Sequence, residues 1–438
     1  MFELNFADFL NPDHELLRAA ELIDWDELHD AMSTYYSILG RHGKPIRLMV
    51  GIHILKHYYN CSDERAVEQL HENAYWQCFS GFTCFQRGQI LDATSLVKFR
   101  NRIGIGGMQR IEGVFINHWQ QLGLIKTRRV CVDTTVQEKN IAYPTDVDLL
   151  FGIREKIVKQ VKRVREAVGF RKPFRSFART GKKLLLHAKK LYRNKPQQRQ
   201  RAIKQLMSMT NRVTNQAARM ANSLYARGHQ DLGRKLNHLV SVGRRIVTQT
   251  QQVLKGQKPV NRLYSLHEHK VCAIKKGKAN KSCEFGSLVS LNINDDGVIL
   301  SHAEYQRNIG DTKTVGTILN RMETNTGKRA GTLAADRGFD QSYKKQNNCR
   351  RRWGVNRLAI PKKGKHPHRY SHNPWFKKAL KQRVKIEPVI GHLKTDHRMG
   401  RCYYKGSEGD TANVVWAAAA WNVKKVNRLN SIKQKKAA

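Results

Sequence analysis

The fold is decided by a short apolar run that ends in a carboxylate, Val130-Cys131-Val132-Asp133-Thr134-Thr135. Its β-branched residues predict a buried strand. A second run of the same kind, Thr332-Leu333-Ala334-Ala335-Asp336, comes much later in the chain. If the two strands are parallel neighbours, their carboxylates lie side by side at one edge of a sheet. The two runs therefore predict a site that is built around Asp133 and Asp336.

Strand and helix patterns around these two runs predict an α/β fold. After the first strand we expect strands at residues 270–274, 285–293, 298–305, 330–335 and 357–360. Two of these strands are joined by Asn294-Asp295-Asp296-Gly297, which is a strong hairpin signal. A long helix is expected from residue 374 to about 399, and it carries Glu387. A meander followed by alternating helix and strand is typical of a ribonuclease H-like fold, with a mixed five-stranded sheet.

Residues 1–128 are expected to be mostly helical, because their apolar positions recur every three to four residues. Ser62 and Asp92 are good N-caps for two of these helices. The helix that starts after Asp92 is predicted to be short and basic, with Lys98, Arg100 and Arg102 near its end. Short helices of this kind are consistent with a helix-turn-helix-like reader of DNA. An ordinary helical bundle that packs on the rest of the protein gives the same pattern.

The chain is strongly basic, with 80 Lys and Arg residues against 35 Asp and Glu residues and a formal net charge of +45. This charge implies a polyanionic partner, although a basic surface that serves solubility or ribosome association would give the same number. Residues 151–262 contain 29 Lys and Arg residues and only 3 Asp and Glu residues, a difference of +26. More than half of the net charge therefore lies in one stretch, between the first and second strands.

We interpret this basic stretch as a helical hairpin or small bundle inserted into the α/β domain. Its apolar residues alternate spacings of three and four in a heptad-like seam, formed by Ile203, Leu206, Thr210, Val213, Ala217, Met220 and Leu224. The charged face either contacts a phosphate backbone or is the solvated side of a structural arm. The near absence of balancing acids favours contact with DNA.

Cysteine usage and hydropathy exclude several other classes of protein. None of the eight cysteines forms a Cys-x2-Cys pair, so a structural zinc site is not expected. The scattered cysteines suit a reducing compartment. The sequence contains neither a secretory signal nor an apolar run long enough to cross a membrane. We therefore expect a cytoplasmic protein that has no membrane partner.

The third acid lies in the frame Arg383-x3-Glu387-x6-Lys394. On one continuous helix these spacings place a carboxylate between two cations along one face. Three carboxylates that converge can hold two divalent ions, and two ions can drive in-line attack on a phosphodiester. Mg²⁺ suits such a site because it prefers oxygen ligands. Taken alone, the frame also describes an exposed helix with surface salt bridges.

Two strand-end aspartates followed by this frame resemble the signature of the DDE transposases of bacterial insertion sequences. The resemblance is to the group typified by insertion sequence five, which is related to the insertion-sequence-four superfamily. Asp336-Arg337-Gly338-Phe339 matches the usual acid-Arg-Gly-aromatic turn, and the segment 276–286 resembles the second- and third-strand block. The family usually has Tyr three residues before the Arg of the frame, where this chain has Leu380. That departure leaves the three acids in place.

The resemblance implies three domains and a metal-dependent reaction on DNA. Residues 1–128 would bind DNA, residues 129–150 and 262–438 would form the ribonuclease H-like catalytic domain, and residues 151–261 would be the insertion. Asp133, Asp336 and Glu387 would be catalytic and hold two Mg²⁺ or Mn²⁺ ions. The residues expected to position DNA are Arg383, Lys394, Arg337, Lys278, Lys281, Lys98, Arg100 and Arg102. Lys278 and Lys281 would equally suit an ordinary surface turn.

The implied activity is DNA transposition. The protein would bind the terminal inverted repeats of its element, cleave there, and join the 3′-hydroxyl ends to target DNA. A homodimer in a synaptic complex is expected, and the seam at 203–224 is a candidate interface. One alternative is a transposase-derived DNA-binding protein without catalysis, and another is a structure-specific nuclease that cuts but does not join.

Overall fold

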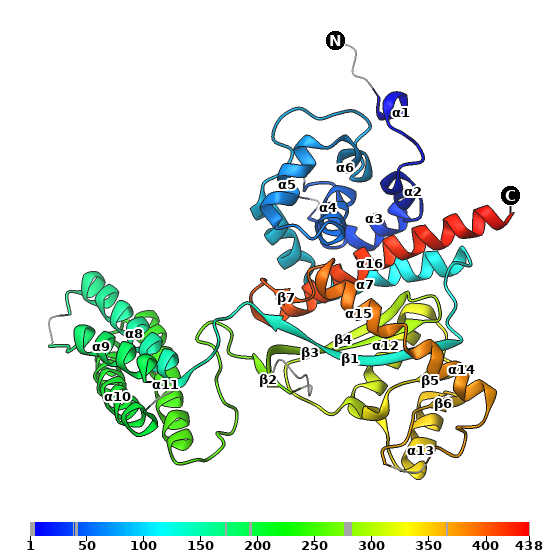
Figure 1. The fold of residues 1–438 in the computed structure, drawn as a ribbon. Coiled ribbons are helices and arrows are strands. Elements are labelled where there is room, and N and C mark those ends of the chain that lie inside the picture. The colour runs from blue at the N-terminus through cyan, green and yellow to red at the C-terminus, as the bar shows by residue number, and fades with distance from the viewer. Residues whose placement is uncertain are drawn as a thin grey trace. The chain divides into compact units, whose positions relative to one another are not determined.

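The computed structural model describes residues 5–37, 39, 43–170, 173–191, 195–275, 283–364 and 367–437. The chain divides into two compact units (Figure 1). Unit 1 consists of residues 1–140 and 274–438, and unit 2 consists of residues 141–273. Within the described ranges, no helix is both long enough and apolar enough to span a membrane.

A mixed β-sheet forms the centre of unit 1, which confirms the predicted α/β class. The described residues contribute seven strands: β1 (Arg129–Lys139), β2 (Cys272–Ile274), β3 (Glu284–Asn294), β4 (Ile299–Tyr305), β5 (Thr332–Ala334), β6 (Arg357–Ala359) and β7 (Arg401–Cys402). The prediction of five strands was wrong by two. Six of the seven strands lie in segments that were expected to be strands, and β7 is the exception. It is only two residues long, and it pairs with Glu138 and Lys139 at the end of β1.

The pairing places β1 at the middle of the sheet. Its neighbour β3 is antiparallel, and β4 is antiparallel to β3 on the far side. On the other side of β1, β5 and β6 follow in parallel. The predicted hairpin between β3 and β4 is confirmed, because the Asn294 side chain accepts hydrogen bonds from the N–H groups of Asp296 and Val298. Gly297 closes the turn with a φ of 83°, which favours glycine.

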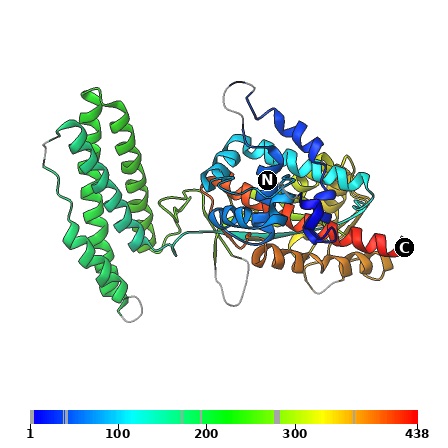
Figure 2. The ribbon, with the colours of Figure 1, turned by 90° about the horizontal axis from the view of Figure 1, so that it is seen from above.

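Helices cover both faces of the sheet (Figure 2). Val130 and Val132 of β1 pack into one core with α7 (Ala93–Gln121), α12 (Val315–Thr326) and part of α16 (Gly406–Ala437). Cys131 points to the opposite face and packs into a second core with α14 (Pro374–Arg383) and α15 (Ile386–Thr395). This alternation is the period of two that a strand imposes. Odd-numbered β1 residues, Asp133 among them, therefore belong to the face that α14 and α15 cover.

The N-terminal part is helical, as predicted, and α7 and α16 lie between its other helices and the sheet (Figure 1). These other helices are α1 (Phe6–Phe9), α2 (Glu15–Glu21), α3 (Trp25–Ser33), α4 (Ile46–Tyr58), α5 (Asp63–Glu72) and α6 (Ala74–Phe79). Ser62 and Asp92 cap α5 and α7 with their side chains, which confirms both predicted starts. The helix after Asp92 is not short, because it continues through a kink at Gly104 to Gln121.

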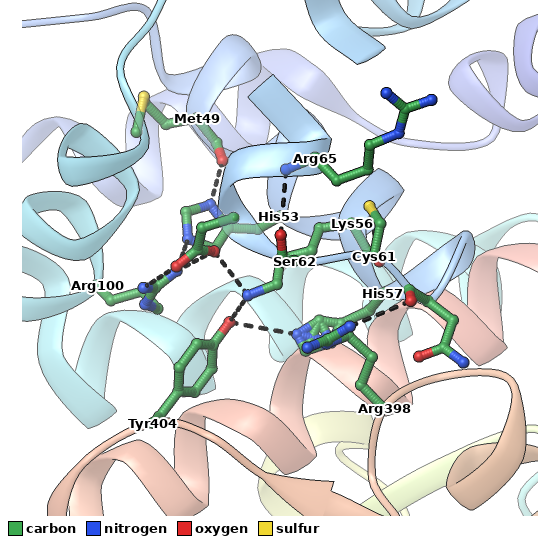
Figure 3. Close-up of polar contacts among 12 residues, drawn as sticks. Met49, His53, Lys56, His57, Cys61, Ser62, Arg65, Arg100, Arg398 and Tyr404 are labelled. Carbon is green, nitrogen blue, oxygen red and sulfur yellow. Dashed lines mark hydrogen bonds and ion pairs between the residues drawn. The ribbon is translucent and has the colours of Figure 1, made fainter. Parts of the chain in front are cut away.

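A buried ionic network joins the N-terminal helices to the segment after β7 (Figure 3). Asp63 accepts hydrogen bonds from Lys56 at 2.6 Å and from both terminal nitrogens of Arg100 at 3.0 and 2.7 Å. Lys56 also donates to the Tyr404 hydroxyl at 2.6 Å. Burial alone would raise the pKa of Asp63, but the two cations hold it below the usual value. Burial lowers the pKa of Lys56 to about 8, against the opposing pull of Asp63.

Unit 2 is a bundle of helices, which Figure 2 shows running side by side. Its described helices are α8 (Asp146–Val168), α9 (Ala178–Lys190), α10 (Pro196–Ala226) and α11 (Gln230–Leu254). The heptad-like seam of α10 is buried throughout, with its apolar members in the core that α10 forms with α8 and α11. The seam is therefore satisfied within one chain, so the expectation that it forms an interface between two copies was wrong.

The remaining described elements of unit 1 lie around β5 and β6. They are the 3-10 turns η1 (Asp311–Lys313) and η2 (Arg337–Phe339) and the helix α13 (Tyr343–Trp353).

Candidate active site

Asp133 lies within β1, and Asp336 follows the carboxyl end of the neighbouring parallel strand β5. In the register of β1 and β5, Cys131 is opposite Ala334. Two residues further along each strand come Asp133 and Asp336, so the same register brings both acids to one edge of the sheet. Asp336 is the N-cap of η2, where its side chain accepts a hydrogen bond from the Gly338 N–H at 2.7 Å. The turn thereby fixes the orientation of this carboxylate.

Arg383 links the third acid to the first. Its guanidinium donates to Glu387 Oε1 at 2.9 Å, and another of its nitrogens lies 3.9 Å from Asp133 Oδ2. The side chains of Arg383 and Asp133 are each 19% exposed, whereas Glu387 is 59% exposed. The structure therefore brings the β1 acid and the α15 acid to opposite sides of one cation, and it leaves Glu387 room to rotate.

The long helix expected over residues 374–399 is instead two helices, α14 and α15, which are separated at Val384 and Lys385. Pro388 provides the physical reason. It has no N–H to donate to the carbonyl of Val384, and its ring would clash with that carbonyl in a continuous helix. Arg383 consequently ends α14, while Glu387 lies in the first turn of α15.

The break changes the placement of the rest of the frame. Lys394 lies in the last turn of α15, half-buried, on a different helix from Arg383. The single helical face that the spacing predicted is therefore absent. Leu380 packs against the core beneath α14, beside residues such as Phe376 and Ala379. An apolar side chain at this position contributes to the attachment of α14 to the sheet.

Asp311 is a fourth carboxylate at this edge, which the sequence interpretation treated only as the start of a helix. Its Oδ1 accepts a hydrogen bond from the Thr134 hydroxyl at 2.6 Å, next to Asp133 in β1. A Cβ atom on Gly338 would lie 2.9 Å from Asp311 Oδ2 and 2.8 Å from Asp336 Oδ1. Glycine at 338 therefore lets two carboxylates approach the same backbone segment. The only local indication of this role in the sequence was the Gly310-Asp311 pair, and the same pair is typical of the start of a helix.

The donor set consists of carboxylate oxygens, which are the ligands that Mg²⁺ and Mn²⁺ prefer. In the described part of the chain, no three His, Cys, Asp or Glu side chains are gathered closely enough to hold an ion. At this site the guanidinium of Arg383 lies between Asp133 and Glu387 and supplies the positive charge there. The carboxylates of this site are therefore of the chemical type that binds a divalent ion.

Thiol chemistry is disfavoured at this part of the sheet. Burial raises the pKa of Cys131 to about 12, and the carboxylate of Asp295 adds to the increase. Burial also raises the pKa of Cys402, which lies in β7 opposite the last residue of β1, to about 12. Both side chains therefore stay protonated and unreactive at neutral pH.

The residues predicted to position DNA are placed differently from one another. Lys98 and Arg337 are exposed, and Arg102 is exposed with its guanidinium 4.8 Å from the centre of the Tyr36 ring. Arg100 is only 8% exposed, because both its terminal nitrogens bind Asp63 (Figure 3). We therefore leave Arg100 out of the proposed DNA contacts. Lys278 and Lys281 lie outside the described residues.

Comparisons with known proteins identify two transposase domains in the chain. Residues 4–102 match a family model described as "Transposase domain (DUF772)", and residues 266–423 match one described as "Transposase DDE domain". The second match contains Asp336 and Glu387 and begins after the strand that carries Asp133. The chain is also 37% identical over 166 residues to a Rhizobium meliloti protein named "Uncharacterized protein ORF8 in nfe locus", covering 37% of this chain and 80% of that protein.

No solved structure matches the chain significantly. The two family models cover most of the N-terminal helices and most of the sheet, and the alignment with the relative covers most of the relative's own length. The chain therefore belongs to the transposases that carry a DDE domain.

Proposed function

We propose that the protein is the transposase of a bacterial insertion sequence of the insertion-sequence-five group. It binds the terminal inverted repeats of its element, cleaves phosphodiester bonds there and joins the 3′-hydroxyl ends to target DNA. Its catalytic domain is proposed to be ribonuclease H-like. The sheet order β4-β3-β1-β5-β6, with only β3 antiparallel to its neighbours on both sides, supports this proposal.

The observation that carries the proposal is the meeting of three chain segments at one sheet edge. The parallel register brings Asp133 and Asp336 together, and Arg383 connects Asp133 to Glu387. These are the three acids, from three separate parts of the sequence, that the DDE signature requires. In a helix with only surface salt bridges, Arg383 would pair with residues of its own helix and would not contact Asp133 in the sheet.

The residues of the chain then have separate roles. Asp133, Asp336 and Glu387 are proposed to hold two ions, Mg²⁺ or Mn²⁺, which when bound activate the attacking oxygen and stabilise the leaving oxygen. When no ion is bound, Arg383 offsets the negative charge of Asp133 and Glu387. When its contacts with these two acids are broken, its guanidinium can make two hydrogen bonds to a phosphate. The hydrogen bond from Gly338 holds Asp336 in one orientation throughout.

DNA binding is proposed for the other parts of the chain. Lys98 and Arg102 are exposed on α7 and suit contacts to a phosphate backbone, and Arg337 and Lys394 lie nearer to the acids. The insertion supplies the largest share of positive charge. Lys278 and Lys281 remain proposed contacts from the sequence. A homodimer within a synaptic complex is proposed because two ends of an element have to be joined together.

The test is cleavage and strand transfer of labelled element-end DNA with Mg²⁺, comparing wild type with Asp336→Asn. Asparagine keeps an oxygen that can accept the Gly338 N–H, so the turn is expected to stay folded. Glu408→Gln removes an exposed carboxylate from α16 and serves as the matched control. We expect Asp336→Asn to lose cleavage and joining while it retains DNA binding, and Glu408→Gln to behave as wild type.

Other results would redirect the proposal. Tight binding by all three proteins with no cleavage by any of them would indicate a transposase-derived DNA-binding protein. Cleavage without joined product would indicate a nuclease. Activity that survives in Asp336→Asn would remove this acid from the catalytic set.

A further inference from the structure

A basic cavity lies at the opposite end of the parallel strands from the catalytic acids. Its volume is about 520 Å³, and it opens at the start of β1, β5 and β6 beside α14. Five cations from three separate segments line it: Lys126, Arg128, Arg129, Arg357 and Lys378. We call this cavity, with these five residues, the amino-edge pocket. Because its cations come from parts of the chain that meet only in the fold, no run of the sequence indicates it.

Within the described part of the chain, ion pairs balance only one of the five cations of the amino-edge pocket. Asp295 is the one carboxylate in its lining, and it pairs with Arg129 at 2.5 Å. Among the residues that the structure describes, no carboxylate forms an ion pair with Lys126, Arg128 or Lys378. Arg357 lies over the Trp375 ring, 5.3 Å from its centre, and likewise has no acidic partner in that part of the chain. Cations that converge on a cavity and outnumber its acids are suited to binding an anion.

The position of the pocket relates it directly to the candidate active site. Arg129 and Asp133 are four residues apart on β1, so they share the face that α14 covers, and the strand separates them by about 13 Å. The helix α14 makes the same connection, since Trp375 and Lys378 line the pocket and Arg383 reaches Asp133. The pocket and the acids are therefore two ends of one rigid strand-and-helix layer.

This separation matches a short length of DNA. Along one strand of B-form DNA the backbone winds around the axis while it rises about 3.4 Å per nucleotide, so neighbouring phosphates are about 7 Å apart and ~13 Å corresponds to about two nucleotides. Arg side chains can fork onto phosphate oxygens, and Lys side chains add point charges. Backbone contacts of this kind fix the register of DNA on a protein without reading its sequence.

We propose that the amino-edge pocket binds a backbone phosphate of the element-end DNA about two nucleotides from the phosphodiester that is cleaved. The proposal rests on the proposed function for the identity of the DNA. In this arrangement the pocket sets which phosphodiester reaches Asp133 and Asp336, because the β1 strand between them has a fixed length. Free inorganic phosphate has the same charged oxygens as a DNA phosphate, and the test distinguishes binding of the two.

The test measures binding rather than cleavage, in the Asp336→Asn background, so it gives an answer even if the chain proves not to cut DNA. The pocket variant is Arg128→Gln with Lys378→Gln, which leaves the backbone carbonyl of residue 128 available to Gly331 and Thr332. The control, Lys435→Gln with Lys436→Gln, removes two exposed cations from the end of α16. The probes are duplexes of one element end in which a single phosphate is replaced by an uncharged methylphosphonate.

We expect one methylphosphonate, about two nucleotides from the element end, to weaken binding of the background protein and of the control by about tenfold. The same replacement is expected to have no further effect on the pocket variant, because the charge and its partner would already be lost. The slope of log affinity against log salt is expected to fall by about 0.9 for each phosphate contact removed.

Three results would overturn the proposal. The first is an equal methylphosphonate effect in the pocket variant and in the control. The second is an absence of any sensitive phosphate within a few nucleotides of that position. The third is binding of inorganic phosphate, measured by calorimetry, that the pocket variant loses while its affinity for unmodified DNA equals that of the control. That last result would assign the pocket to free phosphate instead of DNA.

Discussion

The buried network around Asp63 gives a sharp prediction about stability. Replacing Asp63 by Ala leaves Lys56, which is 3% exposed, and Arg100, which is 8% exposed, without their shared carboxylate. Removal of one partner from a buried ionic group typically costs about 3–5 kcal/mol, because the remaining charges stay desolvated. The Arg65–Glu68 pair on α5 provides the contrast, since both side chains are more than half exposed. Glu68→Ala is expected to cost less than about 1 kcal/mol.

Tryptophan fluorescence is the appropriate assay for this comparison. All seven tryptophans lie in residues 1–140 and 274–438, so the signal reports the unfolding of unit 1 and not of unit 2. Urea titration of wild type, Asp63→Ala and Glu68→Ala at neutral pH gives the three free energies of unfolding. A loss in Asp63→Ala no larger than that in Glu68→Ala would refute the reasoning. It would mean that Lys56 and Arg100 are accommodated without Asp63, by water or by Tyr404.

Two further predictions concern acid and the insertion. Burial is the main cause that lowers the pKa of His53 to about 3 and of His397 to about 4, from 6.5. The folded state therefore binds fewer protons than the unfolded state, so stability falls as pH drops below about 6.5, by about 2 kcal/mol per histidine at pH 5. Urea titrations at pH 7 and pH 5 check this, and an unchanged free energy would contradict it. In unit 2, Leu206→Ala empties a fully buried seam position and is expected to cost about 2–5 kcal/mol. The control is Lys204→Ala, which changes an exposed residue of the same helix. Thermal unfolding of both variants is measured by circular dichroism, and equal thermal stability of the two would contradict the prediction.

Local signals were sufficient for much of the fold. The runs that end in Asp133 and Asp336 could be recognised because burial, β-branching and a terminal acid are all encoded within a few residues. Caps at Ser62 and Asp92 are equally local, and so is the hairpin at Gly297. These features depend on hydrogen bonds within the segment itself, which makes them independent of the rest of the fold.

The parts that were missed depend on distant partners. Arg100 looked like a surface cation, and only the folded chain shows that Asp63, on another helix, neutralises it. Asp311 reaches the acids because a β1 hydroxyl far away in sequence donates to it. The break before α15 is different, because Pro388 is visible in the sequence and lacks the N–H that a continuous helix needs. The spacing of Arg383, Glu387 and Lys394 favoured one helix, whereas this proline favoured two.

The seam of α10 illustrates a further limit. A heptad-like pattern identifies which face of a helix is apolar, but it does not identify what covers that face. In this chain α8 and α11 cover it. Charge was more informative about function than about architecture, since the basic stretch predicts an anionic partner whichever way its helices pack.

The placement of β1 in the sheet also has a consequence for synthesis on the ribosome. Residue 138 of β1 pairs with residue 286 of β3, which is made about 150 residues later. At 5–20 residues per second, β1 waits roughly 7–30 s for its antiparallel partner, and longer for β5. During that interval a strand with a largely apolar middle has no sheet to join, while α8 to α11 can already form a core of their own. Nascent chains of this protein are therefore expected to need chaperone protection most while the insertion is emerging.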